Sequence, residues 1–243
     1  KVLRFSHHRS NLAVIFQNGE DKFLFRKHHI IREEQAYMIK GSGVNLQQFC
    51  YTPEPENGKI RVLLTARMII EKGIFILTDA AIKLKEKYRD KVQFLLCGGL
   101  DDNPKAIKEE DLKRVCDGEY IQWLGYRTDV LSLLKDCHIV AFPSYYKEGL
   151  PKSLIEATAV GRPIITTDSI GCKETVIEGY NGYLIPVQDS ETLADRLEIL
   201  IEDKALRQKM GKNSRCLAEK DFSIENVIAK HLEIYEILMT GNL

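Results

Sequence analysis

The chain has 243 residues, of which 44% are hydrophobic and 29% charged, so it can bury a large core and has the composition of an ordinary globular protein. Lys plus Arg number 35 and Asp plus Glu also number 35, and this zero net charge excludes an overall field that would attract nucleic acid or an anionic membrane. No apolar run approaches the ~20 residues of a membrane-spanning helix.

The first part of the chain is irregular. The apolar run 12–16 predicts a strand and the polar residues 17–21 a turn, and a helix of mixed polarity follows around 22–28. A short strand at 37–40 ends in Gly41-Ser42-Gly43, and the Pro- and Gly-containing residues 53–58 are typical of a linker. The chain starts at Lys1 without an initiator Met, and its first residues resemble the middle of a structural element, so we expect the chain to be a piece of a longer protein.

From residue 59 onward, apolar strands alternate with helices. The run 60–66 is continuously apolar and β-branched, which is typical of a strand buried on both faces. This alternation predicts an α/β fold with a Rossmann-like parallel sheet, helices on both faces and a helical C-terminus. The predicted strands are 60–66, 92–97, 120–124, 138–142, 163–167 and 182–185, and the predicted helices are 74–88, 105–115, 130–135, one that starts at Pro151, 191–201, 204–220 and 223–239.

One Pro- and Gly-bracketed loop joins the strand 138–142 to a helix. Pro151 suits the first helical position because it has no N–H to leave unpaired. Glu148 lies on the loop and Glu156 in the helix, roughly 7–10 Å apart at a rise of ~1.5 Å per residue. Between them lies a helix start that favours an anion at the N–H groups of Lys152 and Ser153. A carboxylate, an anion seat and a second carboxylate predict a nucleotide-sugar site.

A plainer explanation applies to the same residues. Lys152 and Glu156 are four apart on a helix and can form a surface pair worth about 0.3 kcal/mol. Glu148 would then be a solvated loop residue. The ends of the other strands therefore decide between the two interpretations.

Basic residues and glycines follow several predicted strands. Open α/β sheets bind ligands beyond the carboxyl ends of their strands. The loop after strand 60–66 carries Arg67 and Lys72, a guanidinium and an ammonium that together suit a diphosphate. Such loop cations are often only solvated, but turns that contain Gly98 and Arg127 follow two further strands. Their convergence on one edge favours the nucleotide site.

The chain resembles the C-terminal, donor-binding half of a family 4 retaining glycosyltransferase (glycosyl transferases group 1), which has the two-domain GT-B fold. The resemblance covers nearly all of residues 12–243, and the order and spacing of its motifs are specific. They are Gly41-Ser42-Gly43-Val44-Asn45 with Phe49, Arg67-x₄-Lys72-Gly73, Glu148-x₇-Glu156 in its Pro-Ser…Gly-Leu-Pro-Lys-Ser-Leu setting, Gly161-Arg162-Pro163, Asn181-Gly182-Tyr183 and Phe222-Ser223 with Tyr235.

The resemblance implies roles for the matching residues. Arg67, Lys72 and Glu148 would be catalytic: the two cations would hold the donor diphosphate and neutralise the departing nucleotide, and Glu148 would contact the transferred sugar. Glu156 would bind the ribose hydroxyls, and the backbone at Arg127 would meet the base. The full donor-binding set is Arg67, Lys72, Gly98, Arg127, Glu148, Gly149, Leu150, Lys152 and Glu156.

Two departures from the family pattern matter. Many relatives have Gly where Pro151 stands, so one N–H donor to the phosphate is missing here. The family's Val-Asp pair appears as Val44-Asn45.

The resemblance also implies a reaction and a domain division. A UDP- or GDP-linked sugar would be transferred, with retention, to a hydroxyl of a polysaccharide, lipid-linked or other glycoconjugate acceptor. Residues 1–35 would be the remnant of an N-terminal acceptor domain and the interdomain linker, 36–222 the nucleotide-sugar-binding domain, and 223–243 a C-terminal helix that packs back toward the missing domain. The isolated chain is expected to bind the donor without turning it over.

No cofactor, metal or nucleic acid is expected. No Asp-x-Asp occurs in a suitable loop, and neither the six histidines nor the six cysteines are grouped at metal-ligand spacing. The scattered cysteines favour reduced thiols and a cytoplasmic location, with the inner face of the membrane as an alternative for the full-length protein. The competing interpretations are a non-catalytic nucleotide-sugar-binding module and an epimerase or phosphorylase on the same fold. The combination of Glu148-x₇-Glu156 with Arg67-x₄-Lys72 argues against both.

Overall fold

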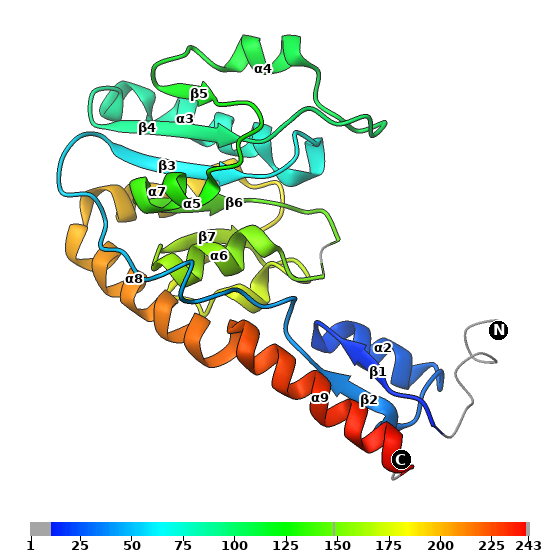
Figure 1. The fold of residues 1–243 in the computed structure, drawn as a ribbon. Coiled ribbons are helices and arrows are strands. Elements are labelled where there is room, and N and C mark those ends of the chain that lie inside the picture. The colour runs from blue at the N-terminus through cyan, green and yellow to red at the C-terminus, as the bar shows by residue number, and fades with distance from the viewer. Residues whose placement is uncertain (1–10, 148, 242–243) are drawn as a thin grey trace.

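The computed structural model describes residues 11–147 and 149–241, which form a large lobe and a small lobe (Figure 1). The large lobe is built on a six-stranded parallel sheet in the order β5-β4-β3-β6-β7-β8. The Rossmann-like fold class predicted from the sequence is therefore confirmed. The strands are β3 (Ile60–Thr65), β4 (Val92–Cys97), β5 (Ile121–Trp123), β6 (Ile139–Phe142), β7 (Ile164–Thr167) and β8 (Gly182–Ile185).

The central strands are apolar because both of their faces are covered by helices. Every residue of β6 and β7 is buried, and Val62, Leu63 and Leu64 of β3 have no exposed surface. Figure 1 shows α3 and α7 packed together behind the sheet and α5 and α6 in front, with α8 running below α6 and α4 beside the edge strand β5. The helices are α3 (Ile74–Tyr88), α4 (Glu109–Val115), α5 (Val130–Asp136), α6 (Lys152–Val160), α7 (Ser190–Glu202) and α8 (Lys204–Leu217).

The small lobe brings together the two ends of the described chain. Strand β1 (Val14–Phe16) pairs in parallel with β2 (Ala36–Met38), and helix α2 (Gly19–Lys27) joins them, followed by a short 3₁₀ turn. Helix α9 (Ile224–Thr240) lies alongside and packs Val227 and Ile234 against Ile39. Helix α9, near the end of the described chain, therefore completes the hydrophobic core of the small lobe that β1 and β2 begin (Figure 1).

Two segments of the chain connect the lobes and run side by side. The N–H of Val44 donates to the carbonyl oxygen of Phe222 at 2.8 Å, and the N–H of Ile224 donates to that of Val44 at 3.0 Å. Lys40 binds Asp221 at 2.8 Å. The connection is therefore a short parallel pairing of two segments that are far apart in the sequence.

Several predicted element boundaries shift, each for a structural reason. Helix α4 begins at Glu109 and not at residue 105, because 105–107 pairs with the loop after β3. Pro151 is the N-cap of α6 and not its first helical residue, because its ψ of 120° is extended. Helix α8 ends at Leu217 and is followed by a π-helical turn, η4 (Ala218–Phe222), after which Ser223 caps α9.

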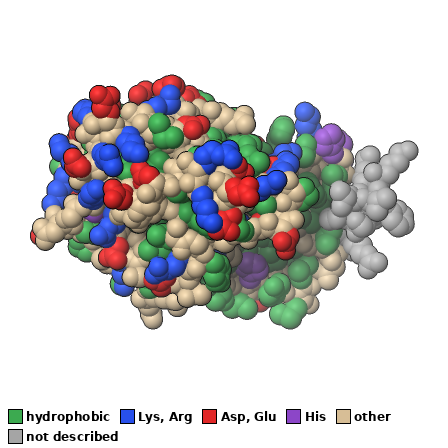
Figure 2. Space-filling model, turned by 90° about the horizontal axis from the view of Figure 1, so that it is seen from above, with side chains coloured by type: hydrophobic (Ala, Val, Ile, Leu, Met, Phe, Trp, Pro, Cys, Tyr) green, Lys and Arg blue, Asp and Glu red, His purple; other side chains and the backbone are tan. Residues whose placement is uncertain are grey.

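Polar and apolar side chains are distributed unevenly over the surface. Figure 2 shows charged side chains spread over the large lobe and hydrophobic ones gathered at the end that holds the small lobe. Within residues 11–147 and 149–241, none of the helices is both long enough and apolar enough to cross a membrane.

Candidate functional site

The predicted site residues share one edge of the sheet. From β3 the chain continues to β4 and β5 on one side, and from β6 to β7 and β8 on the other. The loops after β3 and β6 therefore flank the switch point at which open α/β sheets bind ligands. The first loop carries Arg67 and Lys72, and the second leads to Lys152 and Glu156 at the start of α6.

The two loops are bonded directly to each other. The carbonyl oxygen of Glu71 accepts the N–H groups of Tyr145 and Tyr146 at 2.9 and 3.2 Å and the hydroxyl of Ser144 at 3.2 Å. Gly73 has a φ of 80°, and a Cβ there would lie 2.2 Å from the carbonyl oxygen of Pro143. Only glycine permits this approach, which brings the β3 loop (residues 66–73) against the β6 loop (residues 143–151).

Lys72 lies at this junction and is buried. Its ammonium is 4.9 Å from the ring centre of Tyr146 and 5.6 Å from that of Phe142. Ring faces attract a cation and partly replace the water that it loses on burial. The end of β6 and the loop after it therefore supply aromatic contacts that hold the Lys72 ammonium beside the switch point.

Arg67 occupies the same loop but is exposed over 57% of its side chain. Its Nη1 donates to Oδ2 of Asp101 at 2.8 Å. A guanidinium has five N–H donors in a planar fork, so this contact leaves capacity for an anion.

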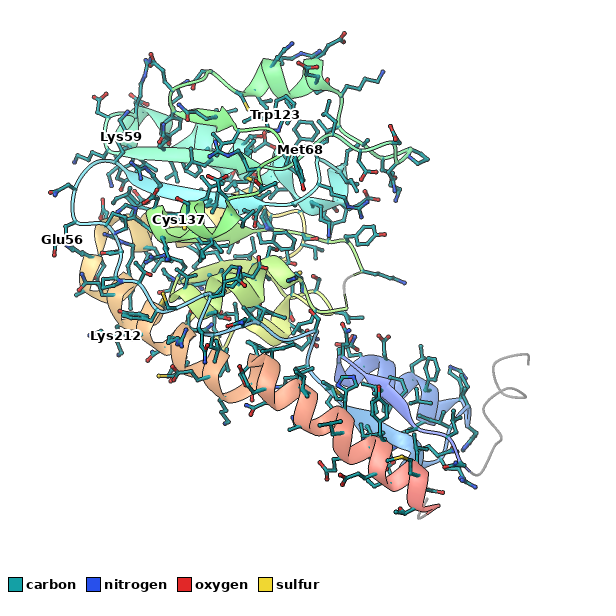
Figure 3. All side chains as sticks on the ribbon, viewed as in Figure 1. Glu56, Lys59, Met68, Trp123, Cys137 and Lys212 are labelled. Atoms are coloured by element: carbon teal, nitrogen blue, oxygen red, sulfur yellow. The ribbon has the colours of Figure 1, made fainter. Side chains whose placement is uncertain are left out.

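Gly98 directly follows β4 at the same edge and is tightly enclosed. A Cβ at this position would lie 1.7 Å from the carbonyl oxygen of Ala66, so no other residue fits. Its N–H donates to the carbonyl oxygen of Gly125 at 2.9 Å, and its own carbonyl accepts the indole N–H of Trp123 at 2.9 Å. Figure 3 labels Trp123 and Met68 near these strand ends. The Gly98 amide is thus engaged within the protein, and close packing accounts for the glycine.

Arg127 follows β5 at the next position along the edge. Its side chain binds Asp129 through two hydrogen bonds of 2.7 and 2.6 Å, and this contact holds the pKa of Asp129 below its usual value. The guanidinium is therefore turned to a neighbour, and the expectation that the backbone at Arg127 meets the base stays a prediction.

The loop and helix after β6 carry the remaining predicted residues. Glu148 lies outside the described residues. Leu150 is buried and packs with Ile155, while a Cβ on Gly149 would lie 2.3 Å from Oε1 of Gln17 in the small lobe. The small lobe therefore reaches the loop that is predicted to contact the donor phosphate, and an ion pair between Glu20 and Lys173 reinforces this approach.

Glu156 is not an ordinary surface carboxylate. Only 15% of its side chain is exposed, and burial raises its pKa although the charge of Lys152 opposes this. Lys152, at 4.0 Å, is 69% exposed and therefore only a weak partner. The interpretation of these two residues as a solvated surface pair does not explain why the carboxylate is buried beside the switch point.

The sequence did not reveal the acidic and basic partners around the β3 loop. Asp101 pairs with Arg67, and Glu71 pairs with Lys105 of the loop after β4. An acidic pair, Asp101-Asp102, directly after a strand end that already carried Gly98 was the available signal. The sequence did not show which cation each carboxylate would pair with, because that depends on how separate loops pack together.

A hollow of about 310 Å³ lies at the opposite edge of the sheet from the predicted site. Figure 3 labels Lys212, one of its lining residues, on that side of the molecule. Its buried Arg207 binds Glu54 at 2.9 Å and the carbonyl oxygen of Leu200 at 2.7 Å. These bonds tie the segment before β3 to the turn between α7 and α8, so the buried arginine has a structural role.

Metal binding has no candidate in the described part of the chain, 11–147 and 149–241. There, no group of three or more His, Cys, Asp or Glu side chains is placed to hold a metal ion. The expectation of a metal-independent reaction stays a prediction.

Comparison with known sequences gives a consistent family. Residues 52–216 match the family model described as glycosyl transferases group 1. The chain is 33% identical to N,N'-diacetylbacillosaminyl-diphospho-undecaprenol alpha-1,3-N-acetylgalactosaminyltransferase of Campylobacter jejuni, covering 96% of this chain and 61% of the relative. It is 29% identical to the capsular polysaccharide biosynthesis glycosyltransferase CapM of Staphylococcus aureus, covering 69% of this chain and 43% of the relative. The chain thus spans 61% or less of the length of these two relatives.

Solved structures share the fold. A glycosyltransferase from Rickettsia africae ESF-5 superposes with a TM-score of 0.84 at 22% identity, covering 98% of this chain and 66% of that one. Anabaena Alr3699/HepE in complex with UDP superposes with a TM-score of 0.80 at 23% identity, covering 95% of this chain and 67% of that one. At such identities the likeness concerns the fold: a parallel sheet with helices on both sides, as in GT-B Rossmann-like domains.

Proposed function

The chain belongs to the glycosyl transferases group 1 family, and we propose that it is the donor-binding part of an enzyme that transfers a sugar from a nucleoside diphosphate sugar to an acceptor hydroxyl. The observation that carries this proposal is the junction at the switch point. There the loop with Arg67 and Lys72 is hydrogen-bonded, through Glu71, to the loop that leads to Glu156.

Transfer requires negative charge to be stabilised on the departing diphosphate. Arg67 and Lys72 supply two cations on one loop, one exposed and one buried against aromatic rings. Fixed charges of this kind stabilise charge that develops in the transition state. The start of α6 at Lys152 adds N–H groups that favour a phosphate. Glu148 would contact the sugar, and Glu156 the ribose.

The donor is a UDP- or GDP-linked sugar in this proposal, transferred with retention and without a metal. The Anabaena structures with UDP and UDP-glucose support a nucleotide-sugar donor. The lipid-linked substrate in the name of the Campylobacter relative supports a glycoconjugate acceptor. The acceptor would bind to a part corresponding to the length of the relatives that this chain does not span. The chain alone would bind the donor without turnover, and we place the full-length protein in the cytoplasm or at the inner face of the membrane.

The alternatives from the sequence gain no support. The curated relatives named above are described as transferases. This favours transfer over a non-catalytic binding module and over an epimerase or phosphorylase.

Titration calorimetry with UDP and GDP tests the proposal. The Arg67→Ala and Lys72→Ala variants should each bind the preferred nucleotide about tenfold more weakly, since each loses a charge-assisted contact to the diphosphate. Arg89→Ala is the matched control: it removes a cation at the end of α3, next to the amino end of β4. Unchanged binding in both site variants, or an equal loss in the control, would refute the proposal.

The ribose assignment has its own test. Glu156→Ala should weaken UDP or GDP but leave inorganic diphosphate little changed, because only the nucleotides carry ribose. An equal loss for nucleotide and diphosphate would mean that Glu156 does not bind the ribose.

A further inference from the structure

The loop after β4, residues 99–107, lies along the loop that carries Arg67 and Lys72. The N–H of Met68 donates to the carbonyl oxygen of Gly99 at 3.0 Å, and the N–H of Ile107 donates to that of Met68 at 2.8 Å. Ile70 and Lys105 are joined by a further backbone bond of 3.0 Å. The β4 loop, as we call residues 99–107, is therefore fixed against the β3 loop by backbone pairing.

Two ion pairs join the same two loops. The β4 loop supplies the acidic residue of one pair and the basic residue of the other. Asp101 of the β4 loop binds Arg67 at 2.8 Å, and Lys105 of the β4 loop binds Glu71. Asp101 is itself held in place because its Oδ1 accepts the N–H of Asn103 at 2.8 Å. The Asn103 N–H, and then Arg67, keep the pKa of Asp101 below its usual value, so its carboxylate is charged at neutral pH.

We propose that Asp101 is a positioning residue for Arg67, holding the guanidinium at the switch point so that it can receive the donor diphosphate. This inference rests on the proposed function of the site. Asp101 is only 16% exposed, whereas Arg67 is 57% exposed, so the pair has a fixed inner member and an accessible outer member. The contact engages Nη1 of Arg67. The rest of the planar fork can meet two phosphate oxygens.

The direction in which loss of Asp101 changes diphosphate affinity shows whether Asp101 positions Arg67 or merely repels the anion. A carboxylate beside an anion site repels the anion, so on charge alone the loss of Asp101 should tighten diphosphate binding. If Asp101 positions Arg67, its loss should weaken binding, because the freed side chain must be ordered again when the ligand binds. A weaker complex therefore cannot be explained by the change in charge.

Calorimetry on the 243-residue chain with UDP, GDP and inorganic diphosphate gives the test. Asp101→Ala should weaken each ligand that binds by about five- to tenfold, the cost of ordering one long side chain. Asp102→Ala is the matched control: it removes the same charge from the next residue, which is exposed, and should leave binding unchanged or slightly tighter. Tighter binding in Asp101→Ala, or an equal loss in both variants, would overturn the proposal. Asp101→Asn keeps an acceptor oxygen and should be intermediate, which tests the role if the alanine variant does not fold.

A double-mutant cycle shows whether Asp101 acts through Arg67. In an Arg67→Ala background, Asp101→Ala should have no further effect on diphosphate binding. A full additional loss would mean that Asp101 acts by another route, and positioning would be wrong although Arg67 still binds the ligand. If Arg67→Ala alone changes nothing, the proposed role of Arg67 fails first, and that of Asp101 fails with it.

Discussion

The strands of the two lobes are stabilised in different ways. The large lobe places six strands between helices on both faces, with a continuous core that includes Leu64 and Phe94. The small lobe has two strands of three residues each, and α2, which joins them, has no buried residue. Two-stranded sheets are at best marginally stable alone. The small lobe therefore depends on α9, which arrives from the other end of the chain.

The difference is also visible at the surface (Figure 2). Phe23 of α2 is 62% exposed and Met239 of α9 is 78% exposed. Concentrations of exposed hydrophobic residues commonly mark surfaces that contact another protein or domain. The core of the large lobe thus lies between its sheet and helices, whereas the small lobe presents large hydrophobic side chains at its surface.

The largest expected contrast comes from deleting core side chains. Leu64→Ala should lower the free energy of unfolding by about 3 kcal/mol, because Leu64 is fully buried in the central strand β3. Phe16→Ala in β1 should instead loosen only the small lobe. Chemical denaturation and amide hydrogen exchange, measured together, distinguish the two. If Phe16→Ala lowers the hydrogen-exchange protection of β3 and β4 as much as Leu64→Ala does, the two lobes are not stabilised separately.

A pH effect of intermediate size should also belong to the large lobe. His138 is buried, accepts the N–H of Arg61 at Nδ1 and contacts the carbonyl oxygen of Pro55 through Nε2. Burial lowers its pKa to about 4 from 6.5. The unfolded chain therefore binds a proton first as the pH falls, and between about pH 7 and pH 5 stability should drop by about 2 kcal/mol.

Denaturation at several pH values checks this expectation. His138→Gln should flatten that part of the pH dependence, because it removes the buried imidazole that takes up a proton on unfolding. An unchanged pH dependence in His138→Gln would contradict the assignment.

The smallest contrast concerns helix caps. Asp189 accepts the N–H of Thr192 at 2.9 Å to cap α7, and Asn18 accepts the N–H of Asp21 at 2.8 Å to cap α2. Asp189→Ala should cost about 1 kcal/mol of global stability. Asn18→Ala should only increase exchange within α2 and the paired strands. Equal shifts of the main unfolding transition would show that the lobes unfold together.

Much of the large lobe could be predicted because its signals are local. The strand 92–97 and the helix 74–88 match their observed bounds, since a continuous apolar run and its helical successor each report their own burial. The start of α4 was wrong because residues 105–107 pair with a loop some forty positions earlier in the chain. The pairing of β1 with β2, and their packing on α9, likewise depend on contacts that no local pattern encodes.

The site shows the same division. Arg67, Lys72, Lys152 and Glu156 were placed on one edge because parallel strands end together. Asp101 and Glu71 were not assigned to their cationic partners, because a charge does not indicate which loop will face it. Asn45 illustrates a local case: its Oδ1 accepts the N–H groups of Gln47 and Gln48, so it caps a turn.

The most direct test of the central claim is an NMR titration of the 243-residue chain with UDP and GDP, following the backbone amides. We expect the largest shifts at Lys72, at Arg127 and in the first turn of α6, all at the carboxyl edge of the large sheet. Shifts confined to the hollow around Arg207 at the opposite edge, or to the small lobe, would contradict the account.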